Sequence, residues 1–104
     1  MDVALSPEDL ATVHKVLHTY EETGIQFHAV RTRQAGAQKF VSTHVLVPGD
    51  WTVHRGHELL EKIEADIRAV LPDSVIFTHL ESVDDPASWE DEKLEHRVPK
   101  KKDG

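Results

Sequence analysis

The stretch Ile25–Val47, "IQFHAVRTRQAGAQKFVSTHVLV", decides the fold. Both of its ends are rich in β-branched and aromatic residues, which favour β-strands. Its centre, "RQAGAQ", contains Gly36, which can adopt a positive φ in a turn. Two strand-forming segments around a short turn predict an antiparallel hairpin, with strands over about residues 25–32 and 40–47. Each of these strands carries one histidine, His28 or His44.

Helical patterns lie on both sides of this hairpin. Ser6 followed by Pro7 is typical of a helix start, and apolar residues then recur at helical spacing, so we expect a helix over about 6–22. Thr52 is a candidate N-cap for a second amphipathic helix, which Pro72 would end. Residues 75–81, "VIFTHLE", read as a third strand.

The order helix–strand–strand–helix–strand predicts an α+β sandwich, a three-stranded sheet with two helices on one face. Apolar residues occur on both faces of the predicted strands. Phe40 and Leu46 share a side with His44, and Phe77 shares a side with His79. Two helices cover only one face of such a sheet. We therefore expect Phe40, Leu46 and Phe77 to lie at a homodimer interface.

Composition restricts the class of protein. A chain of 104 residues predicts one domain, and a formal net charge of −7 disfavours nucleic acid as a partner. No apolar run is long enough for a membrane span. We expect the ordered domain to cover residues 1–82 and a mostly flexible, charged tail to cover 83–104. Within that tail, Trp89 and Leu94 could dock a short helical turn onto the body.

The histidines are the main candidates for chemistry. The chain has eight histidines and no cysteine, so a metal site must use imidazole, carboxylate and water. His79 and Glu81 point to the same face of a strand, and His28 and His44 could face each other across the hairpin. His57, near the start of the second helix, could join them. Zinc accepts such ligands, but the spacing alone favours the ordinary reading, in which a strand histidine is structural or merely solvated.

The other histidines carry weaker signals. His54 lies three residues before His57 and could reach the same ion, so it is a possible additional ligand. His14 and His18 have the i,i+4 spacing of a helical metal site, but a solvated helix face is the better reading. His96 lies in the predicted tail. No nucleophile elbow and no phosphate-binding loop is present, so we expect no enzymatic activity.

Four segments in this order give the chain a resemblance to a known family. It resembles the cytosolic C-terminal domain of the cation diffusion facilitators, the zinc transporter family, over about residues 5–85. The segments are "FHAVRTRQAG", "FVSTHVLV", "HELLEKIEADI" and "VIFTHLE".

The resemblance implies a ferredoxin-like or metallochaperone-like αββαβ fold and a V-shaped homodimer. It also implies a membrane domain in the same transporter, on whose cytoplasmic face this domain would lie, and Zn²⁺ or a similar divalent ion that closes the dimer and favours transport. The family's metal-binding positions match His28, His44, His57 and His79. The family often has aspartate two residues after the last histidine, where this chain has Glu81.

Three other functions are compatible with parts of this sequence. A stand-alone cytosolic metal buffer or regulator would use the same residues. A domain that binds a small organic ligand would need a polar loop at a strand–helix junction, for which "VPGDWT" is the only candidate. A hydrolytic metalloenzyme would need a general base and an open coordination site in a cleft; Glu81 could be that base, but the sequence indicates no cleft.

Overall fold

The structure, a computed structural model, describes residues 2–89. Its elements in chain order are β1 (Asp2–Val3), α1 (Pro7–Glu21), β2 (Gln26–Ala35), β3 (Gln38–Val47), α2 (Val53–Val70) and β4 (Ser74–Ser82). The predicted α+β order of helices and strands is confirmed. The hairpin strands extend further toward Gly36 than predicted. The two-residue strand β1 was not predicted, because it contains too few residues to show any alternation.

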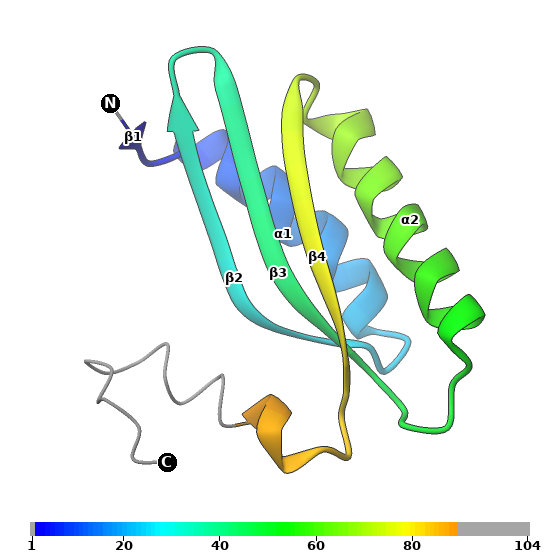
Figure 1. Ribbon diagram of the computed structural model, residues 1–104. Helices are drawn as coiled ribbons and strands as arrows, with labels where there is room; N and C mark the ends of the chain where they lie inside the picture. The colour runs from blue at the N-terminus through cyan, green and yellow to red at the C-terminus, as the bar shows by residue number, and fades with distance from the viewer. Residues whose placement is uncertain (1, 90–104) are drawn as a thin grey trace, which may run out of the picture.

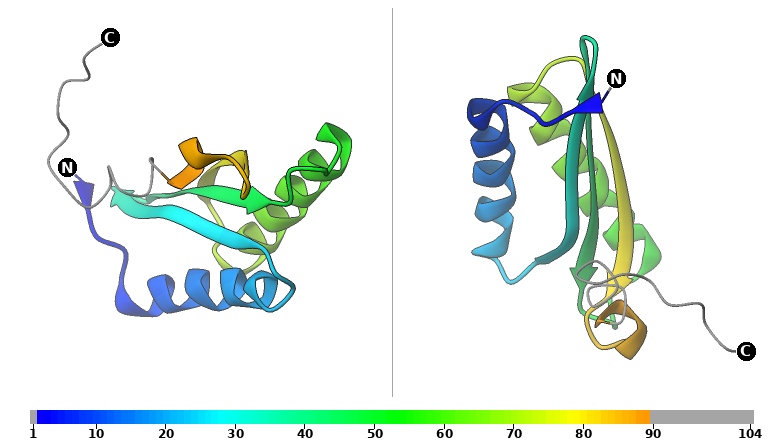
Figure 2. Two further views of the ribbon diagram at one scale, coloured as in Figure 1. Left: turned by 90° about the horizontal axis from the view of Figure 1, so that it is seen from below. Right: turned by 90° about the vertical axis from the view of Figure 1, so that its left-hand side faces the viewer.

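The sheet has the order β1-β2-β3-β4 (Figure 1). The hairpin strands β2 and β3 pair antiparallel, and β4 pairs parallel to β3 after the chain has crossed over through α2. Both helices pack on the same side of the sheet, because their buried side chains form one cluster with Val41 and Val45 of β3. Figure 2 shows α1 and the C-terminal end of α2 on that side. The other side, called the open face below, has no helix of its own among residues 2–85, and it carries the candidate site.

Side-chain caps begin both helices where the sequence predicts. Ser6 Oγ accepts a hydrogen bond of 3.1 Å from the Asp9 backbone N–H, and Thr52 Oγ1 accepts one of 3.1 Å from that of Arg55. Each bond satisfies an N–H group that the first helical turn leaves without a partner. Gly24 has a φ of 98°, which only glycine adopts at little cost, and it turns the chain from α1 into β2.

The core lies between the helices and the covered face of the sheet. Buried side chains from both helices, from β3 and from the loop after α2 fill it, among them Val13, Leu17, Val41, Val45, Ile63, Ile67 and Leu71. Gly56 allows α2 to approach β4 closely, because a Cβ at this position would collide with the side chain of Leu80. The start of α2 therefore rests directly on the strand that carries His79 and Glu81.

Tyr20 links the two helices at the edge of the core. Its hydroxyl donates a hydrogen bond to the carboxylate of Asp66 on α2. Burial, reinforced by this hydrogen bond and by the negative charge of Asp66, raises the pKa of Tyr20. The folded state therefore holds the phenol proton more tightly than the unfolded chain does.

This raised pKa gives stability that is fully present below the tyrosine pKa of the unfolded chain, about 10. It is lost as the pH rises from there through the folded-state pKa. We expect the native chain to be about 1 kcal/mol more stable than Tyr20→Phe at pH 8, and the difference to shrink above pH 10. Urea unfolding of both chains between pH 8 and 11.5 measures it. A difference that stays constant over this range would contradict the linkage.

Within residues 2–89, no helix is both long enough and apolar enough to span a membrane. The structure describes only the first part of the predicted tail, residues 83–89. Residues 83–89 lie against the body, whereas Leu94 and His96 fall outside the described residues.

Candidate metal centre

Three histidines lie side by side on the open face. In the strand register, His28 on β2 is opposite His44 on β3, and His44 is opposite His79 on β4. The rings of His44 and His79 stack with their centroids 5.4 Å apart and their planes 23° apart. The expected pairing of His28 and His44 across the hairpin is thus confirmed. The three residues are called the histidine row below.

A carboxylate joins the row. Glu81 follows His79 by two residues on β4 and therefore points to the same face. Its Oε2 lies 2.7 Å from Nδ1 of His44, and both side chains are largely shielded from solvent. Imidazole nitrogen and carboxylate oxygen are the donors that zinc and similar divalent ions accept in proteins. The donor types on this part of the open face therefore fit such an ion.

An irregularity in β2 shapes the surroundings of the row. The register shifts between His28 and Arg31, and Ala29 has a positive φ of 54°. This β-bulge lets both His28 and Arg31 face the open side although they are three residues apart. Thr43, which is buried, holds the bulge by donating a hydrogen bond of 3.1 Å from Oγ1 to the carbonyl of His28.

A small hollow accompanies the bulge. Its volume is about 150 Å³, and it opens beside His44 and His79. Left-handed backbone in a residue other than glycine is often found at functional sites. The sequence offered no signal for the bulge, since Ala29 is not a residue that usually marks one.

The C-terminal turn, residues 83–89, covers one end of the row. The Trp89 ring meets that of His28 edge-on, with 4.6 Å between centroids and 68° between planes. In Figure 2 this turn lies on the side of the sheet opposite α1. The expected docking of Trp89 is confirmed, and the ordered body extends beyond the predicted boundary at residue 82 because backbone hydrogen bonds hold residues 83–88.

The expected convergence of ligands from four elements does not occur in a single chain. Within residues 2–89, no three His, Cys, Asp or Glu side chains gather closely enough to hold one ion. His57 and His54 belong to α2, on the other side of the sheet, where both are exposed. They pair instead with acids one turn later: His57 Nε2 lies 2.9 Å from Glu61 Oε1, and His54 Nε2 lies 3.5 Å from Glu58 Oε1.

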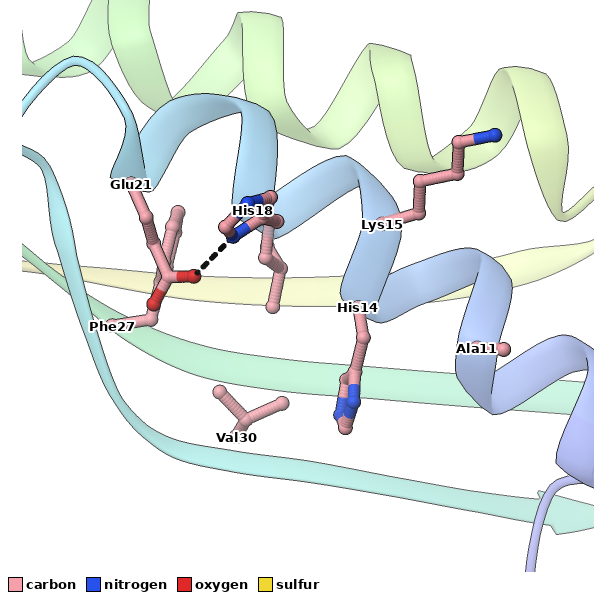
Figure 3. A pocket seen from close by; sticks show the side chains of 8 residues that line it. Ala11, His14, Lys15, His18, Glu21, Phe27 and Val30 are labelled. Atoms are coloured by element: carbon pink, nitrogen blue, oxygen red, sulfur yellow. Dashed lines mark ion pairs between the residues drawn. The ribbon is translucent and has the colours of Figure 1, made fainter.

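His14 and His18 border a groove between α1 and β2 with a volume of about 610 Å³ (Figure 3). Figure 3 shows the ring of His14 directed toward Val30 and that of His18 lying beside Glu21. His18 Nδ1 is 3.5 Å from Glu21 Oε1. The two imidazoles thus point to different neighbours, which agrees with the interpretation as a solvated helix face.

The three expected interface residues differ in exposure. Phe77 is 54% exposed on the open face, and Phe40 is half-buried beneath the guanidinium of Arg33, whose Cζ lies 3.8 Å from the ring centroid. Leu46, in contrast, is only 1% exposed within the single chain. A second copy could contact Leu46 only after the parts of the same chain that bury this side chain had moved. The interface itself stays a prediction.

Comparison with known proteins places this geometry in a family. Residues 5–83 match the family described as "Cation efflux protein, cytoplasmic domain". The chain belongs to this family, the cytosolic domain of the cation diffusion facilitators. The fold, the matched span and the order of the sequence motifs agree with the resemblance described above.

A relative from Synechocystis sp. (strain ATCC 27184 / PCC 6803 / Kazusa) is described as the uncharacterised transporter sll1263. It is 49% identical over 90 residues, which are 86% of this chain. The chain corresponds to 29% of the length of that relative.

Solved structures share the fold. A zinc form of CzrB, a protein described as a zinc transporter, is 27% identical with a TM-score of 0.69, over 80% of this chain and 94% of that one. The metal-bound C-terminal domain of the CzcD transporter from Thermotoga maritima has a TM-score of 0.66 at 22% identity, over 79% of this chain and 99% of that one. At that identity, the second comparison supports the fold alone.

Proposed function

We propose that this domain is the regulatory, metal-binding and dimerising part of a divalent cation efflux transporter. Zn²⁺ or a similar ion would bind at His28, His44, His79 and Glu81 and would favour a closed, V-shaped homodimer that promotes transport. A membrane domain of the same transporter would be its other partner, with the site on the cytoplasmic face of the membrane. The much greater length of the Synechocystis relative supports a membrane domain.

The observation that carries the proposal is the position of the histidine row. Its rings stand at one level on three adjacent strands, beside an acid and on the face without helices. An ion there would lie at the molecular surface rather than inside the core. A second chain could therefore supply the ligands that one chain lacks.

His57 is the candidate for the ligand from the second chain. In its own chain it lies on α2, on the other side of the sheet from the row, and its side chain is 67% exposed. An exposed imidazole near the start of a helix can approach the row of a neighbouring copy. His54 lies in the same helical turn, with a side chain 83% exposed, and is a possible additional ligand.

The negative charge of the chain explains why a bound cation would favour the dimer. With −7 on each copy, two chains repel each other as they approach, and a divalent cation at the contact offsets part of this repulsion. The helix-side core is buried without any metal ligand, so the fold does not depend on the ion. Zinc would therefore shift the monomer–dimer equilibrium rather than fold the chain.

Zinc should strengthen the dimer at neutral pH and lose this effect in acid. Imidazole must be neutral to bind the ion, and free histidine titrates near pH 6.5. At pH 7.5 we expect zinc to lower the dimer dissociation constant by about tenfold or more. At pH 5.5 we expect little change. Sedimentation equilibrium with and without zinc at both pH values measures this, and equal constants with and without zinc at pH 7.5 would refute the proposal.

A separate cytosolic buffer or regulator remains the second candidate, because it would use the same histidine row. Measuring the zinc dependence of transport in vesicles separates the two functions. One set of vesicles would carry this domain joined to the membrane domain of a related cation efflux transporter, and a second set that membrane domain alone. A transport rate unaffected by the domain would favour the buffer.

A further inference from the structure

The C-terminal turn is held to the body by hydrogen bonds at several points. The Val83 N–H donates to the carbonyl of Val47 over 2.8 Å, and Asp84 Oδ2 accepts from the Gly49 N–H over 3.0 Å. Ser88, which is 3% exposed, donates from Oγ to the carbonyl of Ser82 over 2.7 Å. The turn is thus a built part of the structure, anchored on the loop after β3 and on the end of β4.

These bonds aim Trp89 at the histidine row. Its Nε1 donates to the carbonyl of Val83 over 3.0 Å, which fixes the indole across the turn. The ring then meets His28 edge-on at 4.6 Å. His28 is only 8% exposed, whereas His79, two strands away on the same face, is exposed.

This contact conflicts with metal binding at His28. Zinc binds imidazole nitrogen at about 2.0–2.1 Å and needs four ligands around it. In the structure the space next to the His28 ring is occupied by the indole, and no three ligand side chains among residues 2–89 gather around one point. The docked indole therefore lies beside the His28 ring, where the remaining ligands of a shared site would have to approach.

We propose that the C-terminal turn is a latch that competes with metal for His28. The docked Trp89 stabilises the form of the row without an ion, and binding of a divalent transition metal displaces it. This proposal rests on the proposed function, since it assigns the ion to the histidine row. It adds that Trp89 of the same chain competes with the metal ion, so a residue that is not a ligand partly sets the metal affinity.

Removing the indole should therefore tighten metal binding. Edge-on aromatic contacts stabilise by an amount that corresponds to about two- to tenfold in an equilibrium constant. We expect the full chain with Trp89→Ala to bind zinc about two- to tenfold more tightly than the native chain at pH 7.5, by isothermal titration calorimetry. Trp51→Ala is the matched control, because Trp51 stacks on Arg55 at 3.9 Å and lies in the loop before α2. Its zinc affinity should equal that of the native chain.

A second measurement follows the latch itself. The chain has two tryptophans, so Trp51→Phe leaves Trp89 as the only indole. On zinc addition we expect its emission to move to longer wavelength and its quenching by acrylamide to increase, because the ring leaves its contact with His28. Circular dichroism spectra with and without zinc check that the fold is retained.

Each outcome decides between the two proposals. Zinc binding without any change in Trp89 emission, or equal or weaker binding by Trp89→Ala, overturns the latch and leaves the metal site standing. Weaker binding would mean that the indole orients His28 for the ion. If neither the native chain nor Trp89→Ala binds zinc, the proposed function fails and the latch fails with it.

Discussion

In the His44→Ala variant we expect zinc binding at the histidine row to be lost, while the fold is kept. His44 is the centre of the row, opposite both His28 and His79, and its Nδ1 contacts Glu81. Loss of an outer-shell partner of a metal ligand already costs about 10- to 100-fold in affinity. Loss of the central ligand should cost about a hundredfold or more. Isothermal titration calorimetry with zinc at pH 7.5 measures the change.

His18→Ala is the matched control for this experiment. His18, like His44, lies beside an acid, but it is exposed and lies on α1, away from the open face. The His18→Ala variant should bind zinc at the histidine row as tightly as the native chain does. Native-like affinity in His44→Ala, together with a loss in His18→Ala, would move the metal site to the α1 groove.

A core substitution should have the largest effect on stability. Ile63 lies on α2 with no exposed surface and packs in the cluster between the helices and the sheet. Truncation to alanine removes buried methyl groups and leaves a cavity. We expect Ile63→Ala to lower the free energy of unfolding by about 2–5 kcal/mol. Urea unfolding monitored by circular dichroism measures this without added zinc.

Val70→Ala on the same helix is the comparison. Val70 is 46% exposed, so its truncation should change the stability by less than about 0.5 kcal/mol. Zinc should leave the unfolding midpoint of a monomeric sample nearly unchanged, because residues 2–89 of one chain bring no three ligand side chains together and so bind the ion weakly without a second copy. Unfolding of the chain on removal of metal by a chelator would contradict an account in which zinc acts on the dimer.

Local signals predicted most of the fold. The caps Ser6 and Thr52 and the strand-forming residues of the hairpin each act over a few residues, and each lies where the sequence predicted it. The strand β1 escaped prediction because its pairing with β2 depends on a contact made more than thirty residues away in sequence. The position of the C-terminal turn was only partly predicted for the same reason, since its hydrogen bonds join it to residues far away in the sequence.

The structure shows which of the candidate site residues lie together, and the sequence predicted only part of that arrangement. The resemblance to the cation diffusion facilitators supplied His28, His44, His57, His79 and Glu81, and strand periodicity agreed for His79 and Glu81. The bulge at Ala29 and the cover that Trp89 places over His28 depend on tertiary packing, which no local pattern encodes. The assignment of the five residues as ligands, and of Phe40, Leu46 and Phe77 to an interface, remain predictions.

Anomalous diffraction at the zinc absorption edge, from crystals of the full chain grown with zinc, tests the central claim most directly. We predict anomalous peaks next to His28, His44, His79 and Glu81, close to a two-fold axis, with a ligand such as His57 contributed by the second chain. Zinc peaks confined to the exposed histidines of α1, or a two-fold contact that leaves the histidine row in solvent, would contradict it.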